Sequence, residues 1–159
     1  MGRGKRKIEE VVLELVRFFD RNAEISEEDF LGVRFVHIRT DVSELLIGKG
    51  GKTLLALQFL IQNIWRKMIY DDESLKKEFA FLILDVNGYF SDQLKYQLSI
   101  LELKVKEILG SEEIKEAILP PMSDYARKVI HNVVKFNWNN LSSESIGEGD
   151  GRRIVLRKV

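Results

Sequence analysis

The sequence predicts an α+β protein made of two small modules joined by a long helix. Three observations support this fold class. Apolar residues recur at helical spacing in several segments, shorter β-prone or continuously apolar runs lie between them, and a Pro-Pro pair precedes the last helical segment. The 159 residues are enough for one ordinary domain or two small ones, and the absence of cysteine excludes disulfides, cysteine zinc sites and thiol catalysis.

The first module is predicted over residues 8–89. Helical periodicity, β-prone runs and turn residues define its elements, and Asp41 or Ser43 is expected to cap its short second helix. In chain order we expect a helix at 8–21, a weak strand signal at 23–26, a strand at 32–39, a short helix ending at Ile47, a glycine loop, a helix to about Met68, a polar loop at 71–74 and a buried strand at 79–86.

The second half of the chain is predicted to hold a connecting helix with its linker over 90–118 and a second module over 119–159. Leu94, Leu98, Leu101, Val105 and Ile108 form one apolar stripe on the connecting helix, and Gly110 is its expected end. A connector at 111–119, a helix at 123–138, a polar tail at 142–151 and a final strand at 152–159 follow.

Basic and acidic residues are equal in number, 25 of each, so bulk charge does not drive this chain onto nucleic acid. The charges are unevenly placed, however. Residues 1–70 hold 12 basic and 10 acidic residues (net +2), residues 71–119 hold 6 and 11 (net −5), and residues 120–159 hold 7 and 4 (net +3). An acidic middle between two mildly basic ends fits either solvated surface or two anion-facing patches.

No segment has the pattern of a membrane anchor or an export signal. No apolar run approaches the roughly 20 residues that a membrane span requires, and Glu9, Glu10 and Glu14 interrupt the region where a secretory signal needs an apolar stretch. We therefore expect a cytoplasmic protein, with residues 1–7 as a flexible basic tail.

The sharpest local feature is the run Gly48, Lys49, Gly50, Gly51, Lys52 between two apolar helical segments. Glycines let the backbone approach a ligand closely, and the lysines and the following helix favour phosphate. A Walker nucleotide loop would need glycine where Leu46 stands. A KH-type GxxG loop fits better, with Leu45–Ile47 and Thr53–Leu55 lining an apolar groove for bases. A tight helix–helix turn without a ligand is the third interpretation.

Three separated blocks resemble the KH part of the bacterial Jag family, and they occur in that family's order. The resemblance implies a type II KH arrangement, in which a helix, two strands, the helix pair around the GxxG loop and a third strand follow one another. The blocks are Leu46–Leu54, Ala56–Leu60 and Leu84–Tyr89.

A second candidate site lies in the last module, where Arg127 and His131 share a helix face at i, i+4 spacing. Arg offers a rigid fork and His a ring N–H to a phosphate. A structural role for both residues is the alternative. If they bind phosphate, their replacement is expected to weaken binding with little change in melting temperature. Neighbouring cations complete the candidate set: Lys128, Arg152 and Arg153.

This region resembles the R3H module that follows KH in Jag proteins. The matching residues are Pro121-Met122, the Arg127-x-x-x-His131 pair, Ser145-x-Gly147-Glu148 and Arg152-Arg153. The resemblance implies single-stranded nucleic acid as the ligand. It covers about residues 8–159, which is essentially the whole chain.

The chain departs from the Jag pattern in three places. Ala126 stands where an acidic residue usually precedes the motif arginine, and Phe90–Gln93 replaces a start of the connecting helix that is usually rich in arginine. At most seven residues precede the first helix, so functions tied to the family's N-terminal basic domain are not carried over.

We therefore predict a non-enzymatic RNA-binding protein that uses no cofactor or metal. The resemblance implies bacterial origin, RNA-chaperone or post-transcriptional roles, a link to cell shape, and association with a small stand-alone KH protein; a homodimer is also possible. A single-stranded DNA binder, a protein-interaction adaptor with a degenerate nucleic-acid face and a small nucleotide hydrolase are the alternatives.

Overall fold

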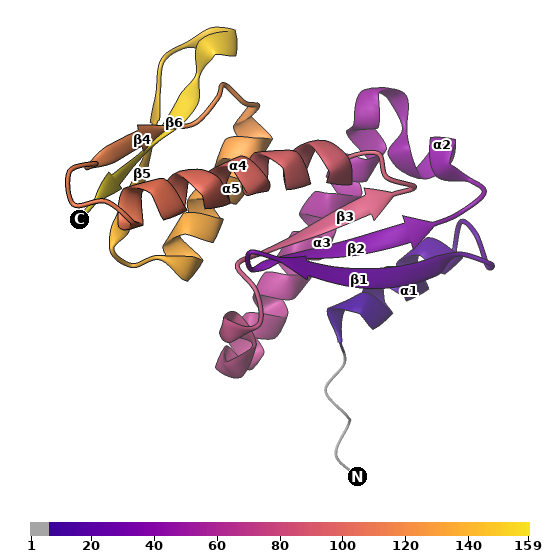
Figure 1. Cartoon of the computed structure of the whole chain (residues 1–159). Helices are drawn as coiled ribbons and strands as arrows, with labels where there is room; N and C mark the ends of the chain where they lie inside the picture. The colour runs from indigo at the N-terminus through magenta and orange to yellow at the C-terminus, as the bar shows by residue number, and fades with distance from the viewer. Residues whose placement is uncertain (1–6) are drawn as a thin grey trace. The chain divides into compact units, whose positions relative to one another are not determined.

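The computed structural model describes residues 7–159 and divides the chain into two units, residues 1–91 and 92–159. Residues 1–6, which make up most of the predicted basic tail, lie outside the described residues. The N-terminal unit has the predicted order of elements (Figure 1). They are α1 (Ile8–Arg17), β1 (Glu24–Phe30), β2 (Val33–Arg39), α2 (Ser43–Ile47), the 3-10 turn η1 (Lys49–Gly51), α3 (Lys52–Asp71), the 3-10 segment η2 (Glu73–Lys77) and β3 (Phe81–Val86).

The three strands form one sheet in the order β1-β2-β3, with β1 antiparallel and β3 parallel to β2. Opposite charges face each other across the first pair, because Glu24 is in register with Arg39 and Asp29 with Arg34. Cross-strand ion pairs of this kind stabilise a register. They explain why the polar segment EISEEDF forms a seven-residue outer strand, although its residue pattern predicts only a weak strand at 23–26.

The core of this unit lies between the helices and one face of the sheet. Val12 and Val16 of α1, Ile61 and Trp65 of α3, and alternate residues of β2 and β3 are buried there. The Trp65 ring stacks on Phe79 with the ring centroids 4.5 Å apart. Burial of one such side chain contributes roughly 1.5–3 kcal/mol, so these contacts fix α3 against the sheet.

Two further details of the first unit differ from the sequence predictions. Helix α1 ends at Arg17 rather than residue 21, and Phe18 beyond it is exposed. Neither Asp41 nor Ser43 caps α2; the N-cap is Val42, without a side-chain hydrogen bond.

The second unit contains two helices and a three-stranded antiparallel sheet in the order β4-β6-β5 (Figure 1). Ser123 caps α5 as predicted, with its hydroxyl accepting from the Ala126 N–H at 3.2 Å. The elements are α4 (Ser91–Leu109), β4 (Glu116–Ile118), α5 (Asp124–Asn137), β5 (Leu141–Ile146), the 3-10 turn η3 (Gly149–Gly151) and β6 (Arg153–Lys158).

The apolar stripe predicted on α4 is buried, and so is the apolar face of α5. Strand β5 was not predicted: the polar run from Ser142 was interpreted as a loop, yet it pairs with β6 along its whole length. Serine and glutamate have low strand propensity, and the pairing with an apolar neighbour overrides it. No helix within residues 7–159 has the length and apolar composition needed to cross a membrane.

Candidate nucleic-acid interface

The glycine loop is a tight turn between α2 and α3 that only glycine can form at its first position. Gly48 has φ of 70° and ψ of 179°, a combination that is essentially restricted to glycine. A Cβ at Gly48 would also lie 2.0 Å from the Thr53 hydroxyl oxygen, and a Cβ at Gly51 would lie 3.1 Å from the Tyr89 ring. The loop shape is therefore set by its glycines.

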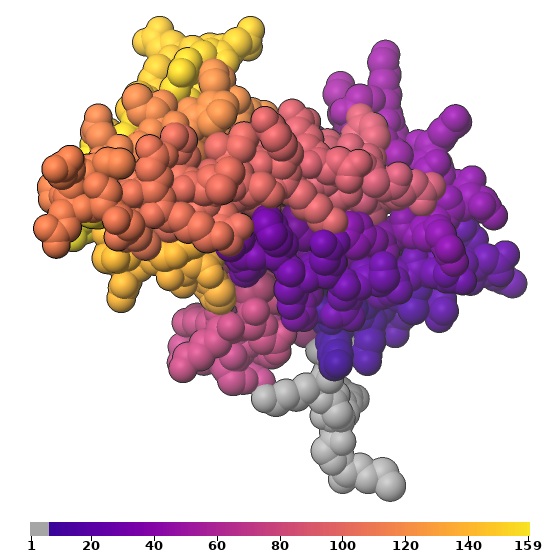
Figure 2. All heavy atoms as spheres, viewed as in Figure 1, coloured from indigo at the N-terminus to yellow at the C-terminus, as the bar shows by residue number. Residues whose placement is uncertain are grey.

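The tip of this loop carries the predicted cations into solvent. Lys49, Gly50 and Lys52 are exposed, and Lys52 opens α3. The segment around α2 and η1 projects from the body of the unit in the space-filling view (Figure 2). Exposed lysines beside the positive end of a helix dipole form a surface suited to phosphate.

The predicted apolar groove is only partly present. Leu46 and Leu54 are completely buried in the core, so the prediction that they line a groove for bases is wrong. Leu45 and Leu55 are exposed by 57% and 40%, and they remain the apolar surface beside the loop. The loop's contact with Tyr89 could not be inferred from sequence spacing, because it joins residues 38 positions apart.

The outer edge of β3 is closed by side chains from α3. The Gln58 amide donates to the Leu82 carbonyl and its oxygen accepts from the Leu84 N–H at 2.6 Å. Gln62 donates to the same Leu82 carbonyl, also at 2.6 Å. These bonds satisfy backbone groups that an edge strand otherwise leaves open, so Gln58 has a structural role.

In the second unit Arg127 is buried rather than projecting into solvent. Only 7% of its surface is exposed. Its guanidinium donates to the Met122 carbonyl at 2.6 Å and pairs with the Asp124 carboxylate. These contacts hold the segment before α5 against the first turn of that helix.

His131 has a partner on each ring nitrogen. Nδ1 lies 2.7 Å from the Ser143 hydroxyl and Nε2 lies 2.9 Å from the Ser145 hydroxyl, both on β5. Burial, and then the nearby Arg127 charge, lower the pKa of His131. Both effects favour the uncharged ring at neutral pH.

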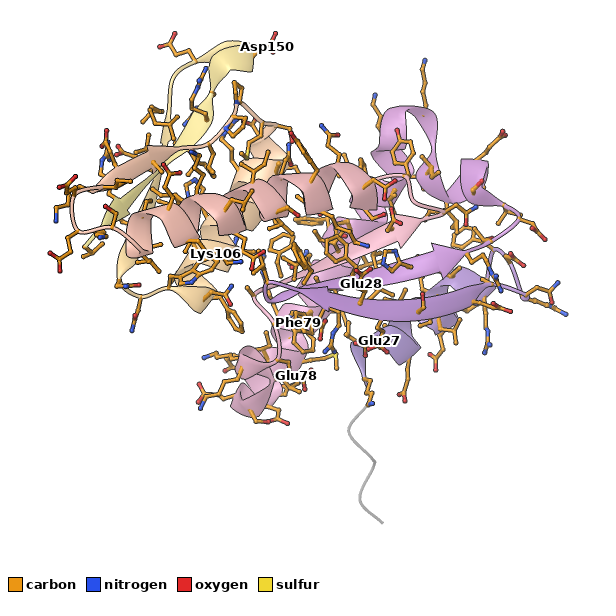
Figure 3. The ribbon with its side chains drawn as sticks, viewed as in Figure 1. Glu27, Glu28, Glu78, Phe79, Lys106 and Asp150 are labelled. Atoms are coloured by element: carbon orange, nitrogen blue, oxygen red, sulfur yellow. The ribbon has the colours of Figure 1, made fainter. Side chains whose placement is uncertain are left out.

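A depression of about 660 Å³ brings two of the predicted arginines together. Arg127 and Arg152 line it along with Asp124, Gly149 and Asp150, and we refer to it as the Arg127–Arg152 depression. Asp150 lies at the turn between β5 and β6 (Figure 3).

The other predicted residues lie outside this depression. Lys128 is exposed on α5, whereas His131 does not line the depression. Arg153 is half-buried and donates to the Gly151 carbonyl at 2.9 Å. Arg152 is thus the exposed arginine of the predicted pair.

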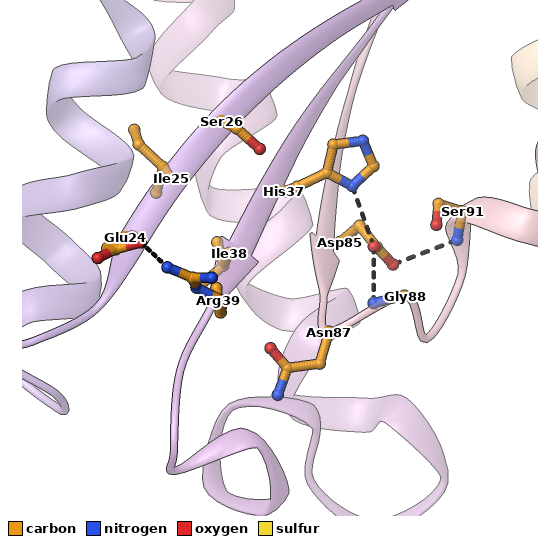
Figure 4. Close-up of a pocket in the computed structure, with 10 residues that line it drawn as sticks. All are labelled: Glu24, Ile25, Ser26, His37, Ile38, Arg39, Asp85, Asn87, Gly88 and Ser91. Carbon is orange, nitrogen blue, oxygen red and sulfur yellow. Dashed lines mark hydrogen bonds and ion pairs between the residues drawn. The ribbon is translucent and has the colours of Figure 1, made fainter.

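A second depression, on the first unit, surrounds His37 and Asp85 (Figure 4). His37 Nδ1 lies 3.2 Å from the Asp85 carboxylate and Nε2 lies 3.1 Å from Glu28. Asp85 is fully buried and accepts backbone hydrogen bonds from Gly88, Phe90 and Ser91. Within residues 7–159 no group of three or more potential ligand side chains could hold a metal. The hydrogen bonds to Asp85 tie the end of β3 to the turn that follows it.

The comparison with known proteins bears on the second unit first. Residues 97–158 match the R3H domain family. RNA-binding protein KhpB of Bacillus subtilis (strain 168) is 30% identical over 122 residues, covering 76% of this chain and 54% of the relative. RNA-binding protein KhpB of Streptococcus pneumoniae serotype 2 (strain D39) is 26% identical over 156 residues, covering 94% of this chain and 44% of the relative.

The chain thus spans about half the length of these relatives. The homology extends beyond the R3H match, since the pneumococcal alignment covers nearly the whole chain. The predicted resemblance is confirmed, and the chain is a Jag-family protein with an R3H domain.

Proposed function

We propose that the chain binds single-stranded RNA through two surfaces, one on each unit. On the first unit, the loop from Gly48 to Gly51 holds the sugar-phosphate backbone with Lys49 and Lys52 beside it. The observation that carries this proposal is the exposed loop tip at the start of α3, shaped by glycines that tolerate no side chain at Gly48. A GxxG loop of this kind clamps the backbone of unpaired nucleotides in KH domains.

On the second unit, the Arg127–Arg152 depression is the proposed second contact with the strand. Arg152 and Lys128 are exposed and supply the charge. Arg127 shapes the depression through its bonds to Met122 and Asp124. His131 lies outside the depression, where its ring contacts the Ser143 and Ser145 hydroxyls and so positions β5. Two weak contacts with one strand raise the apparent affinity through a high effective concentration.

A binding role without catalysis fits the rest of the molecule. The loop follows helix α2 rather than a strand, whereas a Walker loop follows a buried strand. Relatives named RNA-binding protein support RNA as the ligand. Single-stranded DNA remains the second candidate, because phosphate contacts do not distinguish the two. A stand-alone KH protein as partner remains a prediction from the family resemblance.

The test is a titration of unpaired RNA and DNA oligomers of equal sequence at several salt concentrations. Lys49→Glu/Lys52→Glu is compared with Lys76→Glu/Lys77→Glu, which makes the same charge change at exposed positions of η2. We expect a strong loss of affinity only for the loop variant. The affinity of the unaltered chain should fall with rising salt concentration, with a slope that corresponds to the release of a few counterions. Equal losses in both variants, or no RNA binding by the unaltered chain, would refute the proposal.

The second surface is tested in the same way. Arg152→Glu is compared with Lys115→Glu, since both residues are exposed in the second unit and carry the same charge. A loss specific to Arg152→Glu supports the depression as a contact. Tighter binding of DNA than of RNA would favour the second candidate, and ATP-stimulated activity would favour the hydrolase.

A further inference from the structure

A small pocket lies on the second unit beside the Arg127–Arg152 depression. It has a volume of about 190 Å³, and Gln93, Tyr96 and Gln97 line it from α4. These positions are spaced i, i+3 and i+4, so they share one helix face. Pro120 and Pro121 line it from the segment between β4 and α5. We refer to it as the Tyr96 pocket.

The proline wall of the Tyr96 pocket is fixed to the sheet. The Leu119 N–H donates to the Ile154 carbonyl at 2.9 Å, and the Met122 N–H donates to the Arg152 carbonyl at 3.2 Å. Both ends of the Pro-Pro segment are therefore anchored on or beside β6, and proline itself restricts φ. A preformed wall loses little conformational entropy when a ligand binds.

The side chains around the pocket offer an aromatic face and unused polar groups. Tyr96 is 67% exposed, so its ring is accessible to a ligand in solution. Within residues 7–159 the side-chain amides of Gln93 and Gln97 form no hydrogen bond. Their donors and acceptors are free to contact the edge of a planar heterocycle.

The Tyr96 pocket adjoins the Arg127–Arg152 depression, because Pro121 and Met122 line both. Met122 also connects the two arginines: its carbonyl accepts from the Arg127 guanidinium and its N–H donates to Arg152. An occupant of the pocket therefore has an exposed cation beside it. The volume of the pocket lies below the range of drug-sized sites and suits one flat ring system rather than a folded peptide.

We propose that the Tyr96 pocket binds one unpaired base of an RNA strand whose phosphate lies in the Arg127–Arg152 depression. The proposal rests on the proposed function and adds a base contact to its second surface. Aromatic side chains bind unpaired bases by stacking, while an arginine alone supplies only backbone contact. Asp150 opposes the phosphate in the same depression, so Asp150→Asn is expected to tighten binding.

The experiment uses the full chain and a fluorescent oligomer of eight adenosines. Tyr96→Ala is expected to weaken binding about tenfold, which lies within the range for the loss of one stacked base. Tyr96→Phe keeps the ring and is expected to keep binding. Tyr70→Ala is the matched control, because Tyr70 is 83% exposed on α3 of the other unit. Tyr96→Ala should leave the salt slope unchanged, whereas Arg152→Gln should lower it by about one.

A second measurement replaces one adenosine at a time by an abasic nucleotide. One position is expected to weaken binding to the unaltered chain and to have no further effect on Tyr96→Ala. If the unaltered chain does not bind the oligomer, the proposed function fails and the base pocket with it. If the chain binds and Lys49→Glu/Lys52→Glu weakens it, but Tyr96→Ala binds normally, the pocket proposal alone is overturned. A lowered melting temperature with equal losses on intact and abasic oligomers also overturns it.

Discussion

Asp85 and His37 form a buried contact between neighbouring strands, with 3.2 Å between Asp85 Oδ2 and His37 Nδ1. The same carboxylate accepts hydrogen bonds from the backbone N–H groups of Gly88, Phe90 and Ser91 (Figure 4). Asp85 has no exposed surface. One side chain thus joins β2, the end of β3 and the start of α4.

We predict that Asp85→Ala lowers the free energy of unfolding by about 2–4 kcal/mol, because it leaves buried N–H groups without acceptors. Asp85→Asn should cost less, since one oxygen remains to accept. The control is His37→Gln, which removes one partly exposed partner. Urea denaturation at neutral pH measures the stability of all three variants. If Asp85→Ala lowers the free energy of unfolding no more than His37→Gln does, Asp85 does not have the structural role described above.

Replacement by alanine should destabilise the protein to different extents at Gly48 and Gly50 of the loop. Gly48→Ala places a Cβ 2.0 Å from the Thr53 hydroxyl in a backbone conformation that alanine avoids. Gly50 has φ of 60° and ψ of 25°, with nothing within 4 Å of its Cβ position. We expect Gly50→Ala to cost about 1 kcal/mol and Gly48→Ala at least about 2 kcal/mol. Thermal denaturation compares them, and equal costs would show that the loop relaxes freely.

Arg34 is the cation at the centre of an acidic cluster. It donates to Glu9 at 2.8 Å and to both Asp29 oxygens at 2.9 Å, and its guanidinium lies 4.7 Å from the Phe79 ring centroid. The hydrogen bonds to Asp29 are the largest cause of the raised pKa of Arg34. Figure 3 shows Glu27, Glu78 and Phe79 in the same region.

We predict that Arg34→Met costs about 3–5 kcal/mol, because Glu9 is 4% exposed and would keep a buried charge without its partner. The double variant Arg34→Met/Glu9→Gln should recover part of that loss. A double-mutant cycle by urea denaturation measures the coupling. If the changes in the free energy of unfolding of the two single variants simply add up in the double variant, Arg34 does not stabilise Glu9.

Periodicity predicted most elements of the fold because the helices and β3 bury apolar stripes that the sequence displays directly. It missed the three-residue strand β4 inside the predicted connector, and it failed at β1 and β5. The residues of β1 and β5 are mostly polar, and their pairing depends on strands elsewhere in the chain. For β1 the neighbour is a basic strand, and for β5 it is the apolar β6.

At the candidate sites, too, the sequence predicts local features but not contacts between residues distant in the chain. The glycine loop is a local feature, so its shape could be inferred from Gly48 to Gly51. Arg127 is buried by contacts with Met122 and Asp124, which its helical spacing from His131 does not reveal. The serines on both sides of His131 lie on β5, a strand that the sequence does not predict. Tyr96 carries no motif at all, and only its position beside two prolines indicates a role.

Burial changes the expected behaviour of Arg127. The sequence predicted that its loss would leave the melting temperature almost unchanged. We now expect Arg127→Ala to lower the free energy of unfolding by about 1–3 kcal/mol, because the Met122 carbonyl loses its donor. Lys128→Ala, one position away and exposed, should change stability little. Thermal denaturation of both variants tests this, and an unchanged melting temperature for Arg127→Ala would place its guanidinium in solvent.

His131 should make stability depend on pH in the weakly acidic range. Because its folded pKa lies below the ordinary value of 6.5, the unfolded chain binds the proton more readily. The contribution of His131 is therefore complete above pH 6.5 and is lost as pH falls through the folded pKa. Urea midpoints should decrease from pH 7 to pH 5, and His131→Gln should flatten that decrease.

Arg127 provides the control for this prediction. Its charge lowers the pKa of His131, although burial is the larger cause. Arg127→Gln should therefore raise the pKa of the His131 ring. The chain has two histidines, so a proton NMR titration of the ring signals, assigned with His37→Gln, follows His131 directly. A pKa above 6.5 in the unaltered chain, or one that does not move in Arg127→Gln, would contradict the placement of His131 beside a buried arginine.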